Sequence, residues 1–182
     1  SNRWPVDFWC PLAQHSALAG FEVLLPCGDE SERSRAVHIA QITAATVLPK
    51  LSLSGLATQL ASVSGVIAVD TGLGHLAAAL ARPTLSLYGP TDPGLSGTYG
   101  VSQKHLCSTF ACAPCLKKTC AYKGPAILDN DKTVAPPCFS TPPPASVWQT
   151  FEALLPEAAL GRPKSYYDTS GYIKSNNGST GK

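Results

Sequence analysis

Residues 66–76 read Val-Ile-Ala-Val-Asp-Thr-Gly-Leu-Gly-His-Leu, and this stretch decides the fold class. Its first four residues are all apolar, which is typical of a short strand covered on both faces of a sheet. The glycines and the Ala/Leu run that follows predict a turn leading directly into a helix over residues 75–81. A buried strand followed at once by a helix is the repeating unit of parallel sheets.

The same alternation extends outward from this stretch. Helices are predicted over residues 6–19, 30–42, 53–63 and 75–81, and strands over residues 21–26, 46–48, 66–69 and 84–87. The first helix is expected to bury one side, formed by Phe8, Trp9, Leu12 and Leu18. We therefore expect an α/β fold over residues 1–105, a Rossmann-like parallel sheet with helices on both faces.

Beyond Pro90 the regular pattern fades. Residues 106–144 are rich in cysteine and proline and predict an irregular insertion, in which residues 136–144 form a stiff, extended connector. A last amphipathic helix is predicted within residues 145–160. The tail, residues 161–182, is rich in Gly, Ser, Asn and Lys, a composition that predicts disorder.

Length and composition exclude several classes of protein. The chain has 182 residues, 44% hydrophobic and 14% charged, with a net charge of +2, enough for one domain with an extension but not for two full domains. Its 14 Lys and Arg residues are scattered, so we expect no nucleic-acid partner. No apolar run reaches the ~20 residues of a membrane helix. The absence of methionine indicates an excised or truncated piece of a longer protein.

The seven cysteines point to a reducing compartment. Their number is odd, no secretion signal precedes them, and two form a C-x-x-C pair, which together favour free or metal-bound thiols over a disulfide framework. We therefore expect a cytoplasmic protein. Cys10 and Cys27 stand alone among apolar residues and are expected to be buried, inert thiols.

Four of the remaining cysteines have a spacing that is partly that of a metal site. A tetrahedral set of thiolates is the arrangement that structural zinc or iron uses. No second C-x-x-C is present, so free thiols and disulfides remain alternatives. Cys107 is expected to lie outside the set, which consists of Cys112, Cys115, Cys120 and Cys138.

The turn after the buried strand is the main candidate site. Ligands of open parallel sheets bind at the carboxyl ends of the strands, where a helix N-terminus favours phosphate. Gly72 lets a ligand approach the backbone, while the Thr71 hydroxyl and the His75 ring N–H are donors. Asp70 would repel a phosphate, so a sugar hydroxyl suits it better. The alternative is that Asp70 and Thr71 only cap the helix.

A second loop, residues 88–94, should lie at the same sheet edge, since it follows the next strand. Residues 70–83 (Asp-Thr-Gly-Leu-Gly-His-Leu-Ala-Ala-Ala-Leu-Ala-Arg-Pro) and 88–100 (Tyr-Gly-Pro-Thr-Asp-Pro-Gly-Leu-Ser-Gly-Thr-Tyr-Gly) closely resemble the lipopolysaccharide heptosyltransferases of glycosyltransferase family 9, most of all those of the first type. The likeness continues into residues 3–5, 28–33 and 48–53 and covers roughly residues 2–155.

The resemblance implies the C-terminal domain of a GT-B glycosyltransferase, the half that holds ADP-heptose. On the matching motif, Asp70, Thr71, Gly72 and His75 would hold the diphosphate and the heptose. Glu32 would contact the adenosine ribose and Leu51 the adenine. Without the resemblance, Glu32 would be taken for part of a solvated helix face and Leu51 for ordinary core.

The resemblance also implies an activity, the inverting, metal-independent transfer of heptose from ADP-heptose to the Kdo-lipid A inner core of lipopolysaccharide. His75 would stabilise the leaving group, but the family's catalytic base and acceptor surface belong to an N-terminal domain. We therefore expect this chain alone to bind donor and to be inactive, with peripheral association at the inner membrane left open. Asn2 stands where the family has a lysine, with Arg3 adjacent. The other hypotheses are a non-catalytic nucleotide-sugar-binding module and a metal-stapled structural domain.

Overall fold

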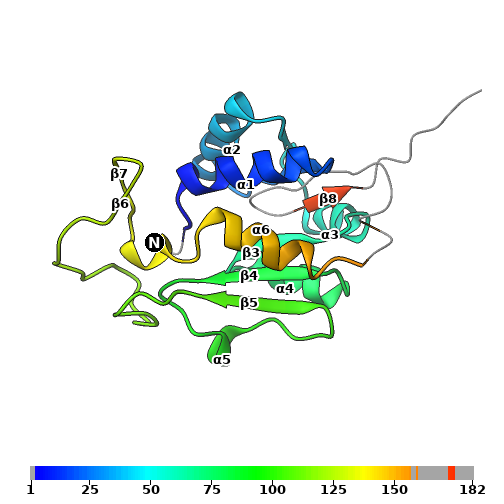
Figure 1. Cartoon of the computed structure of the whole chain (residues 1–182). Helices are drawn as coiled ribbons and strands as arrows, with labels where there is room; N and C mark the ends of the chain where they lie inside the picture. The colour runs from blue at the N-terminus through cyan, green and yellow to red at the C-terminus, as the bar shows by residue number, and fades with distance from the viewer. Residues whose placement is uncertain (1–2, 157–158, 160–171, 175–182) are drawn as a thin grey trace, which may run out of the picture.

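The computed structural model describes residues 3–156, 159 and 172–174 (Figure 1). Its helices are α1 (Val6–Leu18), α2 (Glu30–Ile42), α3 (Leu53–Ala61), α4 (Gly72–Ala79), α5 (Pro93–Ser96) and α6 (Pro144–Glu152), with a 3₁₀ turn η1 (Pro137–Ser140). Its strands are β1 (Glu22–Leu25), β2 (Thr46–Val47), β3 (Val66–Val69), β4 (Thr84–Tyr88), β5 (Gln103–Cys107), β6 (Leu128–Asp129), β7 (Lys132–Thr133) and β8 (Tyr172–Lys174). The expected α/β class is confirmed.

The described strands form two three-stranded sheets rather than one. Strands β3, β4 and β5 are parallel in that order, with Val66 opposite Thr84 and Thr84 opposite Gln103. In the other sheet β1 pairs with β2 in parallel and with β8 antiparallel. Since β2 and β8 occupy both edges of β1, no edge of β1 is left to continue into β3. The hairpin β6–β7 stands apart from both sheets (Figure 1).

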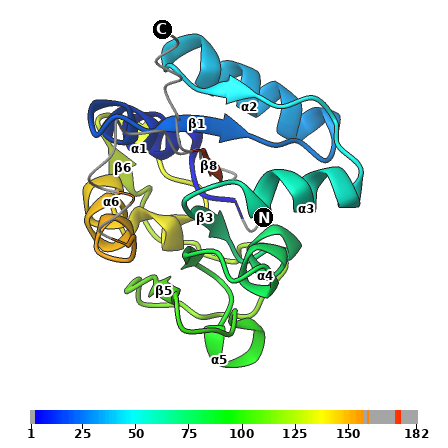
Figure 2. The ribbon, with the colours of Figure 1, turned by 90° about the vertical axis from the view of Figure 1, so that its right-hand side faces the viewer.

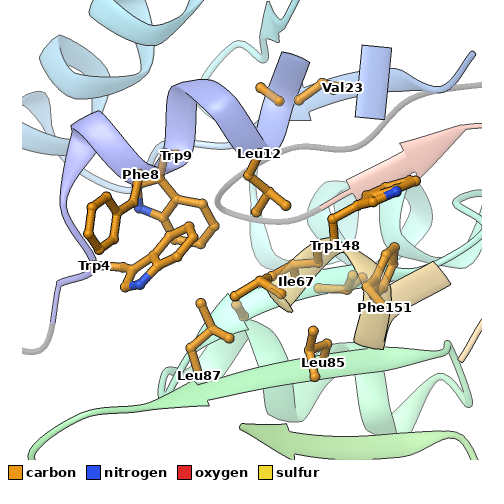
Figure 3. Close-up of a cluster of buried hydrophobic side chains, with 14 of the residues drawn as sticks. Trp4, Phe8, Trp9, Leu12, Val23, Ile67, Leu85, Leu87, Trp148 and Phe151 are labelled. Carbon is orange, nitrogen blue, oxygen red and sulfur yellow. The ribbon is translucent and has the colours of Figure 1, made fainter. Parts of the chain in front are cut away.

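Helices cover both faces of the β3-β4-β5 sheet. Successive side chains of a strand point to opposite faces, so neighbouring residues of β4 contact the helices on the two sides. Leu85 and Leu87 of β4 face the buried cluster drawn in Figure 3, together with α1 and α6 side chains. Ser86, between them, faces α4, where a Cβ on Gly74 would lie 3.5 Å from its Oγ. The expectation of helices on both faces is confirmed for this sheet.

Helix α1 buries three of the four residues expected to point inward, and the prediction for the fourth, Leu18, is wrong. Leu18 is 86% exposed, whereas Phe8, Trp9 and Leu12 are buried. Ser16, one helical turn beyond Leu12, takes the inward position, and its Oγ donates to the Leu12 carbonyl at 2.8 Å. That bond satisfies the only polar atom of the Ser16 side chain, which allows burial.

The region after Pro90 is more structured than the pattern predicted. Strand β5 runs past residue 105, and α5, the hairpin β6–β7 and η1 were not predicted from periodicity. The predicted extended connector contains η1, which buries Cys138 and Phe139. Strand β8 lies within the tail predicted to be disordered, and the rest of that tail lies outside the described residues, as does Asn2. No helix in the described part of the chain is long and apolar enough to span a membrane.

Gly89 allows η1 to pack against the end of β4, so replacing it by alanine should destabilise the fold. A Cβ at this position would lie 2.8 Å from Cε1 and Cζ of the fully buried Phe139 ring. We expect Gly89→Ala to lower the free energy of unfolding by about 1–3 kcal/mol, as overpacking typically does.

Urea unfolding followed by circular dichroism measures this change. Gly72→Ala is the matched control, because a Cβ there meets no atom within 4 Å. Equal changes for the two variants would show that the Phe139 contact does not constrain residue 89.

Candidate functional site

A cavity of about 350 Å³ opens where β1 and β3 end. It is lined by the loop from β1 into α2, by the turn from β3 into α4, by residues at the start of α3 and by the N-terminal segment. Figure 2 shows α2, α3 and α4 on the same side of the molecule around these strand ends. The carboxyl ends of parallel strands are where α/β folds bind ligands, so the cavity is the leading candidate site.

Glu32 lies on α2 at the wall of this cavity, held by the helix start. The Asp29 side chain caps α2, its Oδ1 accepting from the Glu32 N–H at 2.8 Å. In turn Glu32 Oε2 accepts from the Gly28 N–H at 2.7 Å. Among the residues that the structure describes, the other oxygen, Oε1, has no hydrogen-bond partner. The carboxylate is thus fixed by one oxygen and can accept from a ligand hydroxyl with the other.

Two arginines line the same cavity. Arg35 Nη2 donates to the Trp4 carbonyl at 2.9 Å, and Arg3 Nη1 donates to Ser31 Oγ at 3.0 Å. Burial lowers the pKa of Arg35, and the neighbouring charge of Arg3 lowers it further. Neither arginine forms an ion pair within the described part of the chain. Two cations against one carboxylate make the cavity attractive to an anion.

Arg35 was missed by sequence reasoning, which assigned the charges of α2 to a solvated surface. It lies three residues after Glu32, so both side chains emerge from the same face of the helix. Once Glu32 is placed at a site, this spacing places Arg35 there as well. Leu51, which was expected to contact the adenine, lines the cavity. Cys27 lines it as well, and it is half-buried rather than buried as predicted.

The turn from β3 into α4 lies at the cavity, and Thr71 lines it. Thr71 occupies the N-cap position of α4, but its hydroxyl donates back to the Val69 carbonyl at 3.1 Å and caps nothing. Gly72 is exposed, and so is His75 in the first turn of the helix. The amide end of α4 is therefore open to a ligand. Asp70, Gly72 and His75 sit on this turn beside the cavity and do not line it.

The loop after β4 contacts Asp70, which agrees with the expectation that this loop lies at the same sheet edge as the turn after β3. Ser96 Oγ donates to Asp70 Oδ2 at 2.9 Å, so this carboxylate accepts a hydrogen bond from α5. Ser96 is itself held by Tyr88, whose hydroxyl donates to the Ser96 carbonyl at 3.1 Å. Burial, followed by the charge of Asp70, raises the pKa of Tyr88 to about 12, so the phenol stays a donor. Of the two residues in the capping alternative, Thr71 therefore makes no side-chain cap of α4.

Comparison with known families assigns the chain. Residues 1–125 match the sequence profile described as Glycosyltransferase family 9 (heptosyltransferase). The chain belongs to glycosyltransferase family 9. It is 49% identical over 160 residues to lipopolysaccharide heptosyltransferase 1 of Pseudomonas aeruginosa, covering 85% of this chain and 45% of that protein. It is 48% identical over 103 residues to lipopolysaccharide heptosyltransferase 1 of Escherichia coli K12, covering 56% and 32%.

Solved structures of family 9 share the fold. The structure described as E. coli heptosyltransferase WaaC with ADP aligns with a TM-score of 0.64 and 35% identity, over 84% of this chain and 40% of that one. A family 9 enzyme from Veillonella parvula aligns with a TM-score of 0.65 at 20% identity, over 84% and 42%, which supports the fold alone. The resemblance to the heptosyltransferases and the GT-B relationship are thus confirmed, and the chain spans less than half the length of these relatives.

The four clustered cysteines of this family 9 chain line a second cavity, of about 310 Å³. All are free thiols, and burial, with the charges of the other three, raises the pKa of Cys138 to about 11. Over the described residues, no three Cys, His, Asp or Glu side chains converge closely enough to hold a metal ion. The structure therefore gathers Cys112, Cys115, Cys120 and Cys138 around one space without forming a finished metal site.

Proposed function

We propose that this chain binds ADP-heptose in the cavity at the ends of β1 and β3, as the donor-binding part of a heptosyltransferase of the lipopolysaccharide inner core. The observation that carries the proposal is the cavity's polar lining: Glu32 with an open carboxylate oxygen, and the two cations Arg3 and Arg35. A relative of 35% identity is described as solved with ADP, and another structure of the same enzyme with ADP-2-deoxy-2-fluoro heptose.

Each part of such a donor finds a chemically matched partner. The adenine packs on the apolar side chain of Leu51, and the ribose hydroxyls donate to Glu32 Oε1. The diphosphate lies between the arginines and the amide end of α4 at Thr71 and Gly72, where the helix dipole favours negative charge. This order places the sugar beyond the diphosphate, at the turn beside the cavity.

The sugar would meet Asp70 there, and His75 would face the diphosphate. The Asp70 carboxylate accepts from a heptose hydroxyl, since it would repel a phosphate, and Ser96 fixes its orientation. An acceptor hydroxyl, on Kdo-lipid A, attacks the anomeric carbon from the opposite side, and the bond to the diphosphate oxygen breaks with inversion. The negative charge that develops on departing ADP is stabilised by the α4 amides and the His75 ring N–H, without a metal. The base that takes the acceptor proton would come from another domain, so the chain alone binds donor without transferring it.

Calorimetric titration with ADP, with UDP as the control nucleotide, tests the proposal. Saturable binding of ADP but not UDP is expected, because the adenine contact at Leu51 and the ribose contact at Glu32 select the nucleoside. Equal binding of both would leave only a general nucleotide site. Failure of a folded protein to bind either would remove the proposed site.

The variants Asp70→Ala and His75→Ala distinguish a contact with the sugar from a contact with the nucleotide. Removing a charge-assisted hydrogen bond costs about 1.5–3 kcal/mol, so Asp70→Ala should weaken ADP-heptose at least about tenfold and leave ADP nearly unchanged. His75→Ala should weaken both, since its partner is the diphosphate. Asp129→Ala, on the distant hairpin, is the matched control. If Asp70→Ala weakens ADP and ADP-heptose equally, the carboxylate does not face the sugar.

Ser96→Ala tests the orientation of Asp70. The variant loses the 2.9 Å bond to Asp70 Oδ2 but leaves the carboxylate in place. One hydrogen bond contributes about 0.5–1.5 kcal/mol, so we expect a two- to tenfold weaker ADP-heptose affinity with ADP affinity unchanged. Ser34→Ala is the control, because Ser34 is an exposed serine of α2 whose hydroxyl donates to the Glu30 carbonyl of the same helix at 2.9 Å. An unchanged affinity for ADP-heptose in Ser96→Ala would show that the loop after β4 has no part in donor binding.

A further inference from the structure

The segment between β5 and β6 is long and irregular, yet it folds against the rest of the chain. Residues 108–127 contain no helix or strand. Loops of this length without secondary structure are uncommon in compact domains, and small irregular regions usually need a covalent or metal staple. Hydrogen bonds join it to the rest of the chain, among them one from the Leu116 N–H to the Pro90 carbonyl at 2.8 Å and one from the Thr109 N–H to Thr141 Oγ1 at 3.0 Å. Within the segment, the Phe110 and Tyr122 rings meet edge to face at 5.3 Å.

Cysteines from both sides of the hairpin β6–β7 line one cavity at this segment. Cys112, Cys115 and Cys120 come from the irregular segment, and Cys138 comes from η1, with the hairpin between them in the chain. All four line the cavity of about 310 Å³. Four sulfur atoms around one space are a complete ligand set for a tetrahedral ion, whereas Cys107, in β5, does not line it.

The charge around this space and the absence of helix or strand in residues 108–127 both favour an ion there. Four thiolates and a divalent cation carry a net charge of −2, and two cations, Lys117 and Lys123, line the same cavity. Cys138 is buried and fixed by the packing of η1, while Cys112 and Cys120 are exposed on the irregular segment. No element of secondary structure prevents these two from moving toward Cys138.

We propose that Cys112, Cys115, Cys120 and Cys138 bind a structural Zn²⁺ ion. The sulfur atoms do not yet converge in the structure, so binding contracts the cavity around the ion and draws the irregular segment onto η1. Each ligand gives up its thiol proton as the Zn–S bond forms, so binding releases protons. No oxidant is consumed. Because the Leu116 N–H donates a hydrogen bond to the Pro90 carbonyl, the closed site also stabilises the loop that follows β4.

Metal content and cobalt spectroscopy test the proposal. Protein purified under reducing conditions without chelator should contain about one zinc per chain by plasma emission. After the zinc is stripped, titration with Co²⁺ should give the visible bands of a tetrahedral ion and the near-ultraviolet charge-transfer band of thiolate ligands. Cys120→Ser should weaken both signals and lower the zinc content, and the matched control Cys107→Ser should leave them unchanged.

The parent protein decides the question even if Cys120→Ser does not fold. Zinc far below one per chain, together with a Co²⁺ spectrum lacking tetrahedral bands, overturns the proposal. Disulfides among the four cysteines, found by mass spectrometry in protein isolated with its thiols blocked, overturn it as well. Equal loss of metal in Cys107→Ser and Cys120→Ser would place the ion elsewhere.

Discussion

Replacement of Phe151 by alanine is expected to lower the free energy of unfolding by about 3–5 kcal/mol, the range for large aromatic truncations in a core. Phe151 lies on α6, is fully buried, and belongs to the cluster that joins α1 and α6 to β3 and β4 (Figure 3). Its ring packs directly on the chain before β3, where a Cβ on Gly65 would lie 2.7 Å from its Cζ. Backbone on one side limits how far the core can close around the missing ring.

Urea unfolding monitored by far-ultraviolet circular dichroism measures the change. Leu18→Ala is the control, because Leu18 is an apolar helix residue that is 86% exposed, and its truncation should change the free energy by less than about 0.5 kcal/mol. A loss for Leu18→Ala as large as that for Phe151→Ala would mean that the apolar side of α1 is placed wrongly.

Elements with strong local signals could be predicted from the sequence. Helix α2 and strand β3 have the predicted bounds, because a capping Asp29 precedes α2 and Gly65 precedes an uninterrupted apolar run. Helix α4 begins three residues earlier than predicted, at Gly72. Glycine has a low helix propensity, so local reasoning assigns it to the turn, although the N-terminal turn of a helix tolerates it.

Elements defined by distant partners were not predictable in this way. Strand β5 reads Gln-Lys-His-Leu-Cys, without clear alternation, and exists because β4 offers it a parallel edge. Strand β8 pairs with β1 from more than a hundred residues away, which no local period can indicate. The turn at Asp70 and Thr71 was found from the sequence because strand, glycines and helix are adjacent there. Glu32 was placed only through the family resemblance, and Arg35 only through the structure.

Removing both cations of the cavity should have the largest effect on nucleotide binding. Arg3 and Arg35 line the space proposed for the diphosphate, and neither is neutralised by an ion pair in the part of the chain that the structure describes. Charge-assisted hydrogen bonds contribute about 1.5–3 kcal/mol each, so each single change to glutamine should weaken ADP about tenfold or more. The double variant should weaken it by about a hundredfold or more. Because the two guanidinium groups are coupled, the losses need not add.

Titration with ADP and with adenosine distinguishes a phosphate contact from a general disturbance of the site. Adenosine carries no phosphate charge, so its affinity should change little in Arg3→Gln and in Arg35→Gln, and the dependence of ADP affinity on salt should become weaker. Arg33→Gln is the matched control, since Arg33 is exposed on the same helix and does not line the cavity. Arg35 also bonds the Trp4 carbonyl, so tryptophan fluorescence must show that the N-terminal segment remains packed. If adenosine and ADP weaken equally in a folded variant, the arginines support the cavity wall and the diphosphate lies elsewhere.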